Sequence, residues 1–419
     1  MARKEVQLTD AGRTDPLAPI PGRPRVLSVW LWYPAAAAGA APAPYAPGAW
    51  NDLHLPAPVG WGETEFDAVR TRAAEGGRPD VSRHPLVVLE PGLGLAAPQY
   101  TALAENLASQ GFIVAGVTPT YSANATVLDG RTVRSTDAGN PRTFDAADLH
   151  APAAARAADA LLAVWVADAH FVARALADPG RTPPAAHADL RHVGYVGHSF
   201  GGAAALEACR TDPNCTAAVD LDGTQFGPVS RLGLDRPFLL VATDSCIAAS
   251  CRGVTASCRG VTASATANAS DQKVAAGMMA ASRGHGRTQV LTGAGHFDLT
   301  DYGAYYLAAP LRKLLPLGKQ GGPGLLRKVG DDVGAFLRSP TAGRGSSSTV
   351  STDATTVVAP ERSLLQPAAR AAVERTRALP HQEFIEYGKS CRVWDRDAIV
   401  AGADGAWRLR LHQGTGSPS

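Results

Sequence analysis

The chain has 419 residues, of which 45% are hydrophobic and 19% are charged, proportions typical of a soluble globular enzyme. Its 40 Lys and Arg residues nearly balance its 38 Asp and Glu residues, and the formal net charge is +2. This balance gives no reason to expect nucleic acid or an anionic membrane surface as the main partner. No run of about 18 or more apolar residues is present, so we expect no transmembrane helix.

The cysteines and the first residues bear on the compartment. The segment Met1–Glu5 carries charges with no apolar stretch behind them, so no secretory signal is expected in the sequence as printed. Cys209 and Cys215 flank a short turn and could be bridged across it, whereas the other four cysteines have no metal-ligand spacing. A cytosolic chain with six free thiols is the alternative, but the pattern favours an exported protein.

The predicted elements begin after a polar, Pro-rich lead-in over residues 1–25, which we expect to be irregular. Short apolar runs then alternate with helical stretches. Such an alternation predicts a mostly parallel central sheet with helices on both faces. The expected strands cover residues 26–33, 86–89, 112–117, 193–196, 217–221, 238–242 and 289–291, and the expected helices cover 100–110, 151–176 and 201–209.

The last hundred residues lose this rhythm and become rich in Gly, Ser and Thr. We therefore expect a catalytic domain over residues 26–317 and an irregular, partly disordered C-terminal appendage over residues 318–419, with one helix over 363–379. Residues 251–257 are repeated verbatim as 258–264, which is too short for a repeat architecture and indicates an expanded loop.

The motif that carries chemistry is Gly197-His198-Ser199-Phe200-Gly201, which matches the Gly-x-Ser-x-Gly nucleophile elbow. The elbow needs a sharp turn between a strand and a helix, and bulky side chains two positions from the serine would collide there. In this chain the motif follows a predicted strand and opens a helix of small residues, as the elbow requires. The sequence therefore predicts an α/β-hydrolase fold with Ser199 as the nucleophile.

A general base and an acid should follow Ser199 in chain order Ser…Asp…His. His296 lies on a Gly-rich turn after the last predicted strand and is the expected base, whereas His198 adjoins the serine and points elsewhere in an elbow. Asp222 and Asp244 each follow a predicted strand at the sheet edge where catalytic loops gather. The pattern alone leaves these two acids open.

An oxyanion site is expected beside the elbow. Pro91-Gly92-Leu93-Gly94 directly follows a strand, where these enzymes place the second backbone donor. The residue after the nucleophile supplies the first donor. The N–H groups of Leu93 and Phe200 are therefore the predicted pair, because the reaction needs donors aimed at the developing alkoxide.

The order of these motifs resembles the platelet-activating-factor acetylhydrolases and their bacterial esterase and lipase relatives. The likeness extends from about residue 26 to residue 317 and rests on Trp30–Pro34, His84–Leu89, Gly92–Gly94, Leu107–Ala115, Gly197–Ala203, Leu221–Gly223 and Gly295–Phe297. The resemblance implies that Asp222 is the acid and that Leu93 and Phe200 form the oxyanion pair. The interval from Asp222 to His296 is longer than usual in that family, and the duplicated segment accounts for much of the excess.

The same resemblance implies a calcium-independent hydrolase that releases short or oxidised acyl chains from the sn-2 position of phospholipids. It implies no metal and no organic cofactor, and the only membrane contact would be a transient one at a lipid interface. In this chain Glu90-Pro91 replaces the Ser-His that is common before Gly-Leu-Gly, so acyl or headgroup preference is expected to differ.

Two alternative functions stay open. A cutinase-like polyester hydrolase or general lipase shares this fold but takes its acid after the strand at 238–242, so that Asp244 would be essential. A degenerate hydrolase fold that serves only as a binding module is the non-enzymatic alternative.

Overall fold

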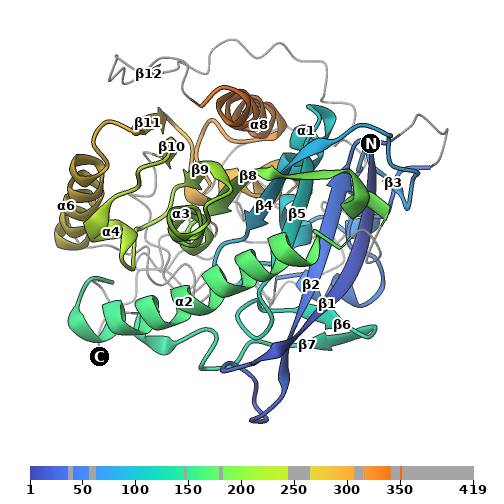
Figure 1. Cartoon of the computed structure of the whole chain (residues 1–419), viewed down its shortest axis with the longest axis horizontal. Helices are drawn as coiled ribbons and strands as arrows, with labels where there is room; N and C mark the ends of the chain where they lie inside the picture. The colour runs from blue at the N-terminus through green and yellow to red at the C-terminus, as the bar shows by residue number, and fades with distance from the viewer. Residues whose placement is uncertain are drawn as a thin grey trace, which may run out of the picture.

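The structure is a computed structural model that describes residues 1–35, 41–55, 63–145, 149–178, 183–243, 265–305, 315, 317–340 and 350–351. Its centre is a ten-stranded sheet with strand order β12-β11-β10-β9-β8-β4-β5-β2-β1-β3 (Figure 1). The strands are β1 (Ala2–Thr14), β2 (Pro24–Tyr33), β3 (Ala74–Glu75), β4 (His84–Glu90), β5 (Ile113–Thr118), β8 (Ala188–His198), β9 (Cys215–Leu221), β10 (Phe238–Thr243), β11 (Gly286–Leu291) and β12 (Val350–Ser351).

Strands β4, β5 and β8 to β12 run parallel to one another, and β2 pairs antiparallel with both β5 and β1. A separate hairpin consists of β6 (Thr126–Leu128) and β7 (Arg131–Val133). The carboxyl ends of β4, β8, β9, β10 and β11 therefore meet at one edge of the sheet, and the loops that leave this edge carry the predicted site.

Helices cover both faces of the sheet, as predicted (Figure 1). One face carries α2 (Pro152–Ala175), α3 (Phe200–Thr211), α4 (Val229–Leu232) and α6 (Ala265–Ala281). The other face carries α1 (Thr101–Ser109), the short α7 (Tyr302–Tyr305) and α8 (Pro323–Arg338). Alternate β4 side chains explain the two layers, since Leu86 and Val88 pack toward the first face and Val87 and Leu89 toward the second.

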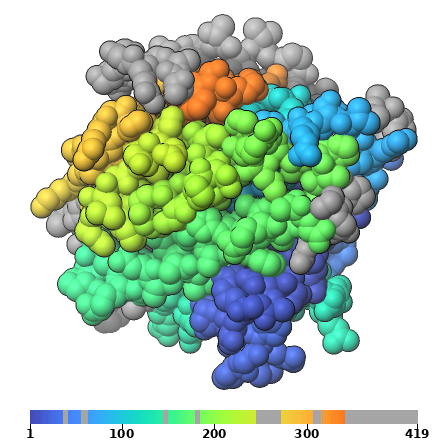
Figure 2. Space-filling model, in the orientation of Figure 1, coloured from blue at the N-terminus to red at the C-terminus, as the bar shows by residue number. Residues whose placement is uncertain are grey.

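The long helix α2 runs across the face seen in Figure 2, with the N-terminal strands β1 and β2 below it. Pro152 stands at its first turn, where a missing N–H is harmless. Its buried residues recur every three or four positions, which places one stripe of the helix on the sheet, and they include Ala158, Leu161, Leu162, Trp165, Ala169 and Val172.

The prediction of an irregular lead-in over residues 1–25 is wrong, because residues 2–14 form β1. Strand β1 pairs along β2, with Ala2 opposite Tyr33. Its charged side chains hide the strand from a hydrophobicity pattern, but Arg3 lies 4.3 Å above the ring of Trp30 and pairs with Glu75 at 2.9 Å. Cross-strand partners here override weak intrinsic strand preference.

The predicted end of the domain at residue 317 also needs correction. Residues 323–338 form α8, which packs on α1 and buries apolar side chains in the same core. These side chains are Leu325, Leu326, Val329, Val333, Phe336 and Leu337. The duplicated segment 251–264 and the predicted helix over 363–379 lie outside the described residues.

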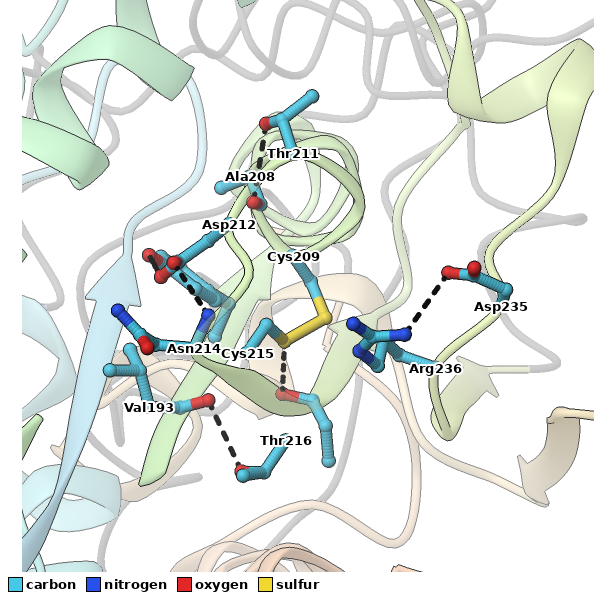
Figure 3. Close-up of a disulfide and its surroundings, with 12 residues drawn as sticks. Val193, Ala208, Cys209, Thr211, Asp212, Asn214, Cys215, Thr216, Asp235 and Arg236 are labelled. Carbon is cyan, nitrogen blue, oxygen red and sulfur yellow. Dashed lines mark hydrogen bonds and ion pairs between the residues drawn. A yellow bond between two sulfur atoms is a disulfide. The ribbon is translucent and has the colours of Figure 1, made fainter. Parts of the chain in front are cut away.

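A disulfide joins Cys209 to Cys215, at the end of α3 and the start of β9 (Figure 3). The turn between them is fixed by Asp212, which accepts a hydrogen bond from the backbone N–H of Asn214 at 2.9 Å. The bridge therefore closes the helix-to-strand turn at the end of the sheet opposite the predicted site.

Candidate active site

Ser199 occupies the turn between β8 and α3, as the elbow motif predicts. Its backbone has φ 54° and ψ −123°, a conformation that is rare for any residue except glycine. Its N–H donates a hydrogen bond of 2.9 Å to the carbonyl of Leu221, which ties the turn to the end of β9. Such strain costs about 1–3 kcal/mol and persists only where the surroundings enforce it, as they do at many functional sites.

The two glycines of the motif are required by close backbone contacts. A Cβ on Gly197 would lie 1.9 Å from the carbonyl oxygen of Gly201. A Cβ on Gly201 would lie 2.2 Å from the carbonyl oxygen of Pro91, in the predicted oxyanion turn. The elbow and the oxyanion turn are thus packed backbone to backbone, and neither can carry a side chain at these points.

Asp222 and His296 contact each other, with 2.8 Å between Oδ2 of the aspartate and Nδ1 of the imidazole. Asp222 also accepts two hydrogen bonds from Thr243, one from the backbone N–H at 2.7 Å and one from the side-chain hydroxyl at 2.9 Å. Asp222 has φ 58°, so its backbone, like that of Ser199, is held in a sparsely populated conformation. The carboxylate is therefore aimed at the imidazole by its neighbours.

The charge state of this pair follows from burial and from hydrogen bonds. Burial raises the pKa of the Asp222 carboxyl, but the hydrogen bonds from His296 and Thr243 outweigh it and leave the pKa below its usual value. The neighbouring Asp220 accepts hydrogen bonds from Gly223 and Gln225, and burial raises its pKa to about 7. Asp222 is thus an anion at neutral pH, while Asp220 holds its proton more tightly.

The predicted oxyanion donors lie on either side of the elbow. Phe200 is the first residue of α3, so its N–H has no acceptor within the helix. Leu93 is buried in the turn after β4, and its N–H has no acceptor in the described part of the chain. A Cβ on Gly92, the residue before Leu93, would lie 3.4 Å from the Cβ of Ser199, which places this turn directly beside the elbow.

His198, the residue before the nucleophile, is fully buried and does not face solvent. Its Nδ1 lies 2.8 Å from the hydroxyl of Tyr100, and its Nε2 lies 3.0 Å from the carbonyl oxygen of His296. Burial, with the nearby His296, lowers the pKa of His198 well below its usual value, so the ring is neutral. His198 thus forms hydrogen bonds behind the elbow.

Glu90, at the end of β4, is fully buried, and neither of its carboxyl oxygens has a hydrogen-bond partner among the residues that the structure describes. Burial raises its pKa well above the usual value, with the charge of Asp168 acting in the same direction. This replacement before the oxyanion turn therefore adds a neutral acid to the interior rather than a charge to the site.

A cavity of about 590 Å³ lies next to the predicted oxyanion turn and next to the turn that carries His296. Its wall includes Gly94 and Leu95, which follow Leu93, and Phe297, which follows His296. The remaining wall mixes apolar and polar side chains, and an ion pair of 3.1 Å between Arg134 and Asp52 contributes charge. The apolar part of the remaining wall consists of Leu53, Leu55, Tyr302 and Leu315. A cavity of about 590 Å³ suits a small organic molecule.

Sequence reasoning missed two contacts of the site, Thr243 on Asp222 and Tyr100 on His198. Asp244, the alternative acid, and the other four cysteines lie outside the described residues. In the described part of the chain, no three His, Cys, Asp or Glu side chains are grouped as metal ligands. A search of the same residues finds no helix that is long and apolar enough to span a membrane.

Comparison with known proteins gives structural neighbours only, since no protein-family model and no curated protein matches the sequence. A ferulic acid esterase from Streptomyces cinnamoneus is 29% identical, with a TM-score of 0.63 over 80% of this chain and 88% of that one. A dienelactone hydrolase-like promiscuous phosphotriesterase from metagenomic libraries is 12% identical, with a TM-score of 0.43 over 81% and 99%. A dienelactone hydrolase from Anabaena variabilis is 14% identical, with a TM-score of 0.39 over the same shares. The chain therefore has the α/β-hydrolase fold, and its structural neighbours include an ester hydrolase.

Proposed function

We propose that this chain is a serine carboxylic-ester hydrolase in which Ser199 is the nucleophile, His296 the base and Asp222 the acid. The observation that supports this most is the 2.8 Å contact between His296 Nδ1 and Asp222, beside a serine in a strained elbow. An ionised carboxylate at Nδ1 fixes the imidazole tautomer whose Nε2 can accept a proton, which is the role the acid has in serine hydrolases.

The reaction follows from these roles. His296 Nε2 takes the hydroxyl proton as Ser199 Oγ attacks the ester carbonyl, and the N–H groups of Leu93 and Phe200 stabilise the oxyanion. His296 then gives the proton to the departing alcohol oxygen, which leaves an acyl group on Ser199. A water molecule deprotonated by His296 attacks the acyl-enzyme, and collapse of the second intermediate releases the acid and returns the proton to Ser199.

Two substrate classes are in question. The resemblance to platelet-activating-factor acetylhydrolases favours short acyl esters, including sn-2 acyl groups of phospholipids. The second candidate is an ester of an aromatic acid, because the neighbour with 29% identity is named a ferulic acid esterase and the cavity of about 590 Å³ far exceeds an acetyl group.

Two measurements test the proposal. A fluorophosphonate probe should label the wild type and fail to label Ser199→Ala, and the same pair should differ in hydrolysis of nitrophenyl esters. An unlabelled, inactive wild type with normal folding would support the binding-module alternative instead. A panel of a short-chain sn-2 phospholipid, methyl ferulate and nitrophenyl esters of graded length then separates the substrate classes by kcat/KM.

A further inference from the structure

Tyr100 and His198 connect the two loops on which the proposed reaction depends. The backbone N–H of Gly92 lies 2.8 Å from the hydroxyl of Tyr100, which lies 2.8 Å from Nδ1 of His198. Nε2 of His198 lies 3.0 Å from the carbonyl oxygen of His296. We propose that Tyr100 and His198 are positioning residues that hold the oxyanion turn and the base in register across the elbow, an inference that rests on the proposed function.

These hydrogen bonds form a relay that runs from the Gly92 N–H through Tyr100 and His198 to the His296 carbonyl oxygen. The groups at its two ends fix the direction of every hydrogen bond in the relay. A backbone N–H can only donate, so Gly92 donates to the oxygen of Tyr100. A carbonyl oxygen can only accept, so Nε2 of His198 carries a hydrogen and donates to His296. The neutral ring then has its lone pair on Nδ1, which accepts the hydroxyl hydrogen of Tyr100. All four groups are satisfied in one arrangement and in no other.

The interior around this relay leaves little freedom for another arrangement. Tyr100 and His198 are both fully buried. A Cβ on Gly92 would lie 3.0 Å from Nδ1 of His198 and 3.4 Å from the hydroxyl of Tyr100, so the turn is packed directly on the pair. Buried polar groups that lose a partner here cannot recover it from water, and the backbone must move instead.

The ends of the relay distinguish it from an ordinary buried hydrogen bond. One end is the residue before Leu93, a proposed oxyanion donor, and the other end is the backbone of His296, the proposed base. Loss of the relay should therefore change the geometry of transition-state stabilisation, which lowers kcat and leaves KM unchanged. A purely structural role would lower thermal stability and leave both kinetic constants as they are.

The relay has two arms, the Tyr100–His198 hydrogen bond and the His198–His296 hydrogen bond. Three substitutions separate them. Tyr100→Phe removes the hydroxyl, and His198→Gln keeps a donor near the Nε2 position but loses the acceptor for Tyr100. His198→Asn keeps an acceptor for Tyr100 but does not reach His296. We expect each to lower kcat about tenfold, the factor given by one hydrogen bond of about 1.4 kcal/mol, at unchanged KM. Affinity for a trifluoromethyl ketone, which forms an oxyanion adduct on the serine, should fall in parallel.

Double variants test whether the residues act as one unit. Tyr100→Phe and His198→Gln cut the same arm, so the double variant should be no slower than either single variant. Tyr195→Phe is the matched control, because its hydroxyl donates 2.6 Å to Asp212, which follows α3 at the end of that helix opposite Ser199. This control should lose stability and keep its kinetic constants.

The relay is overturned if kcat of Tyr100→Phe stays within about twofold of the wild type, or if the effects of Tyr100→Phe and His198→Gln multiply. A loss of stability in Tyr100→Phe as large as in the control, with unchanged kinetics, would equally reduce the pair to core packing. Failure of the proposed function would appear in the wild type itself, which would then not react with the fluorophosphonate probe.

Discussion

Replacing Asp222 by Asn is the sharpest test of the proposed acid. The carboxylate accepts from His296 Nδ1 and from both donors of Thr243, at 2.7–2.9 Å. An asparagine has one acceptor oxygen and one donor nitrogen. With the oxygen kept by the Thr243 N–H, the amide nitrogen faces His296 and donates to Nδ1, so the ring hydrogen moves to Nε2. A base protonated at Nε2 cannot take the proton of Ser199.

The size of this effect follows from the loss of the reactive tautomer. The same change in a serine protease triad lowers kcat about 10⁴-fold, which is about 5.4 kcal/mol of barrier at 1.36 kcal/mol per factor of ten. The side chains have nearly the same shape, so we expect folding and KM to change little. Steady-state hydrolysis of a nitrophenyl ester gives kcat and KM, and fluorophosphonate labelling reports the reactivity of Ser199 independently.

The matched comparison is Asp244→Asn, which removes the acid that a cutinase-like enzyme would use. We expect this variant to keep most of its activity. The reasoning is refuted if Asp222→Asn loses less than about 100-fold in kcat, or if Asp244→Asn alone abolishes hydrolysis.

Three further predictions concern stability. Replacing Cys209 and Cys215 by Ser should lower the free energy of unfolding, measured by urea titration, by about 2 kcal/mol, which is the chain-entropy value for so short a loop. The same substitutions should leave kcat unchanged. Phe336→Ala in α8 should lower the free energy of unfolding by about 3 kcal/mol, because removal of a buried aromatic side chain leaves a cavity. An unchanged free energy of unfolding would mean that α8 is an appendage. Burial raises the pKa of Asp220 to about 7, above about 3.9 in the unfolded chain, so the folded protein alone keeps this proton and stability falls as pH rises between these values. Asp220→Asn should therefore flatten the pH dependence of unfolding, and an unchanged slope would contradict the assignment.

The parallel core of the fold was predictable because its strands are buried on both faces. The expected strand over residues 86–89 is β4, and the expected helix over 151–176 is α2, each within two or three residues of its observed ends. Such segments carry near-continuous apolar runs or a helical apolar stripe, so pattern and structure agree. The elbow was predictable for a different reason, since only glycine fits where Gly197 and Gly201 contact backbone oxygens.

The missed strand β1 and the missed Tyr100 contact share one physical cause, which is stabilisation by partners distant in sequence. Strand β1 depends on its pairing with β2, and its own side chains are mostly polar. Helix α8 does carry an apolar stripe at helical spacing, but Gly- and Ser-rich sequence after it obscured that signal. Tyr100 is another such case, since its hydroxyl meets His198 across 98 positions of the chain. Contacts of that separation leave no mark in a local pattern.

The proposed site has two parts, one on the helix-and-strand unit that the disulfide closes and one outside it, and heating should displace them at different temperatures. Ser199 precedes α3 and Asp222 follows β9, and Cys209–Cys215 covalently closes the other end of this helix-and-strand unit. Helix α3 therefore cannot slide far along β9, and Ser199 and Asp222, the proposed nucleophile and acid, should keep their relative positions under thermal stress. In the described part of the chain, hydrogen bonds and packing attach His296 and the predicted oxyanion turn to that unit. Inactivation short of global unfolding should accordingly begin with displacement of His296, the proposed base, while Ser199 keeps its position in the elbow.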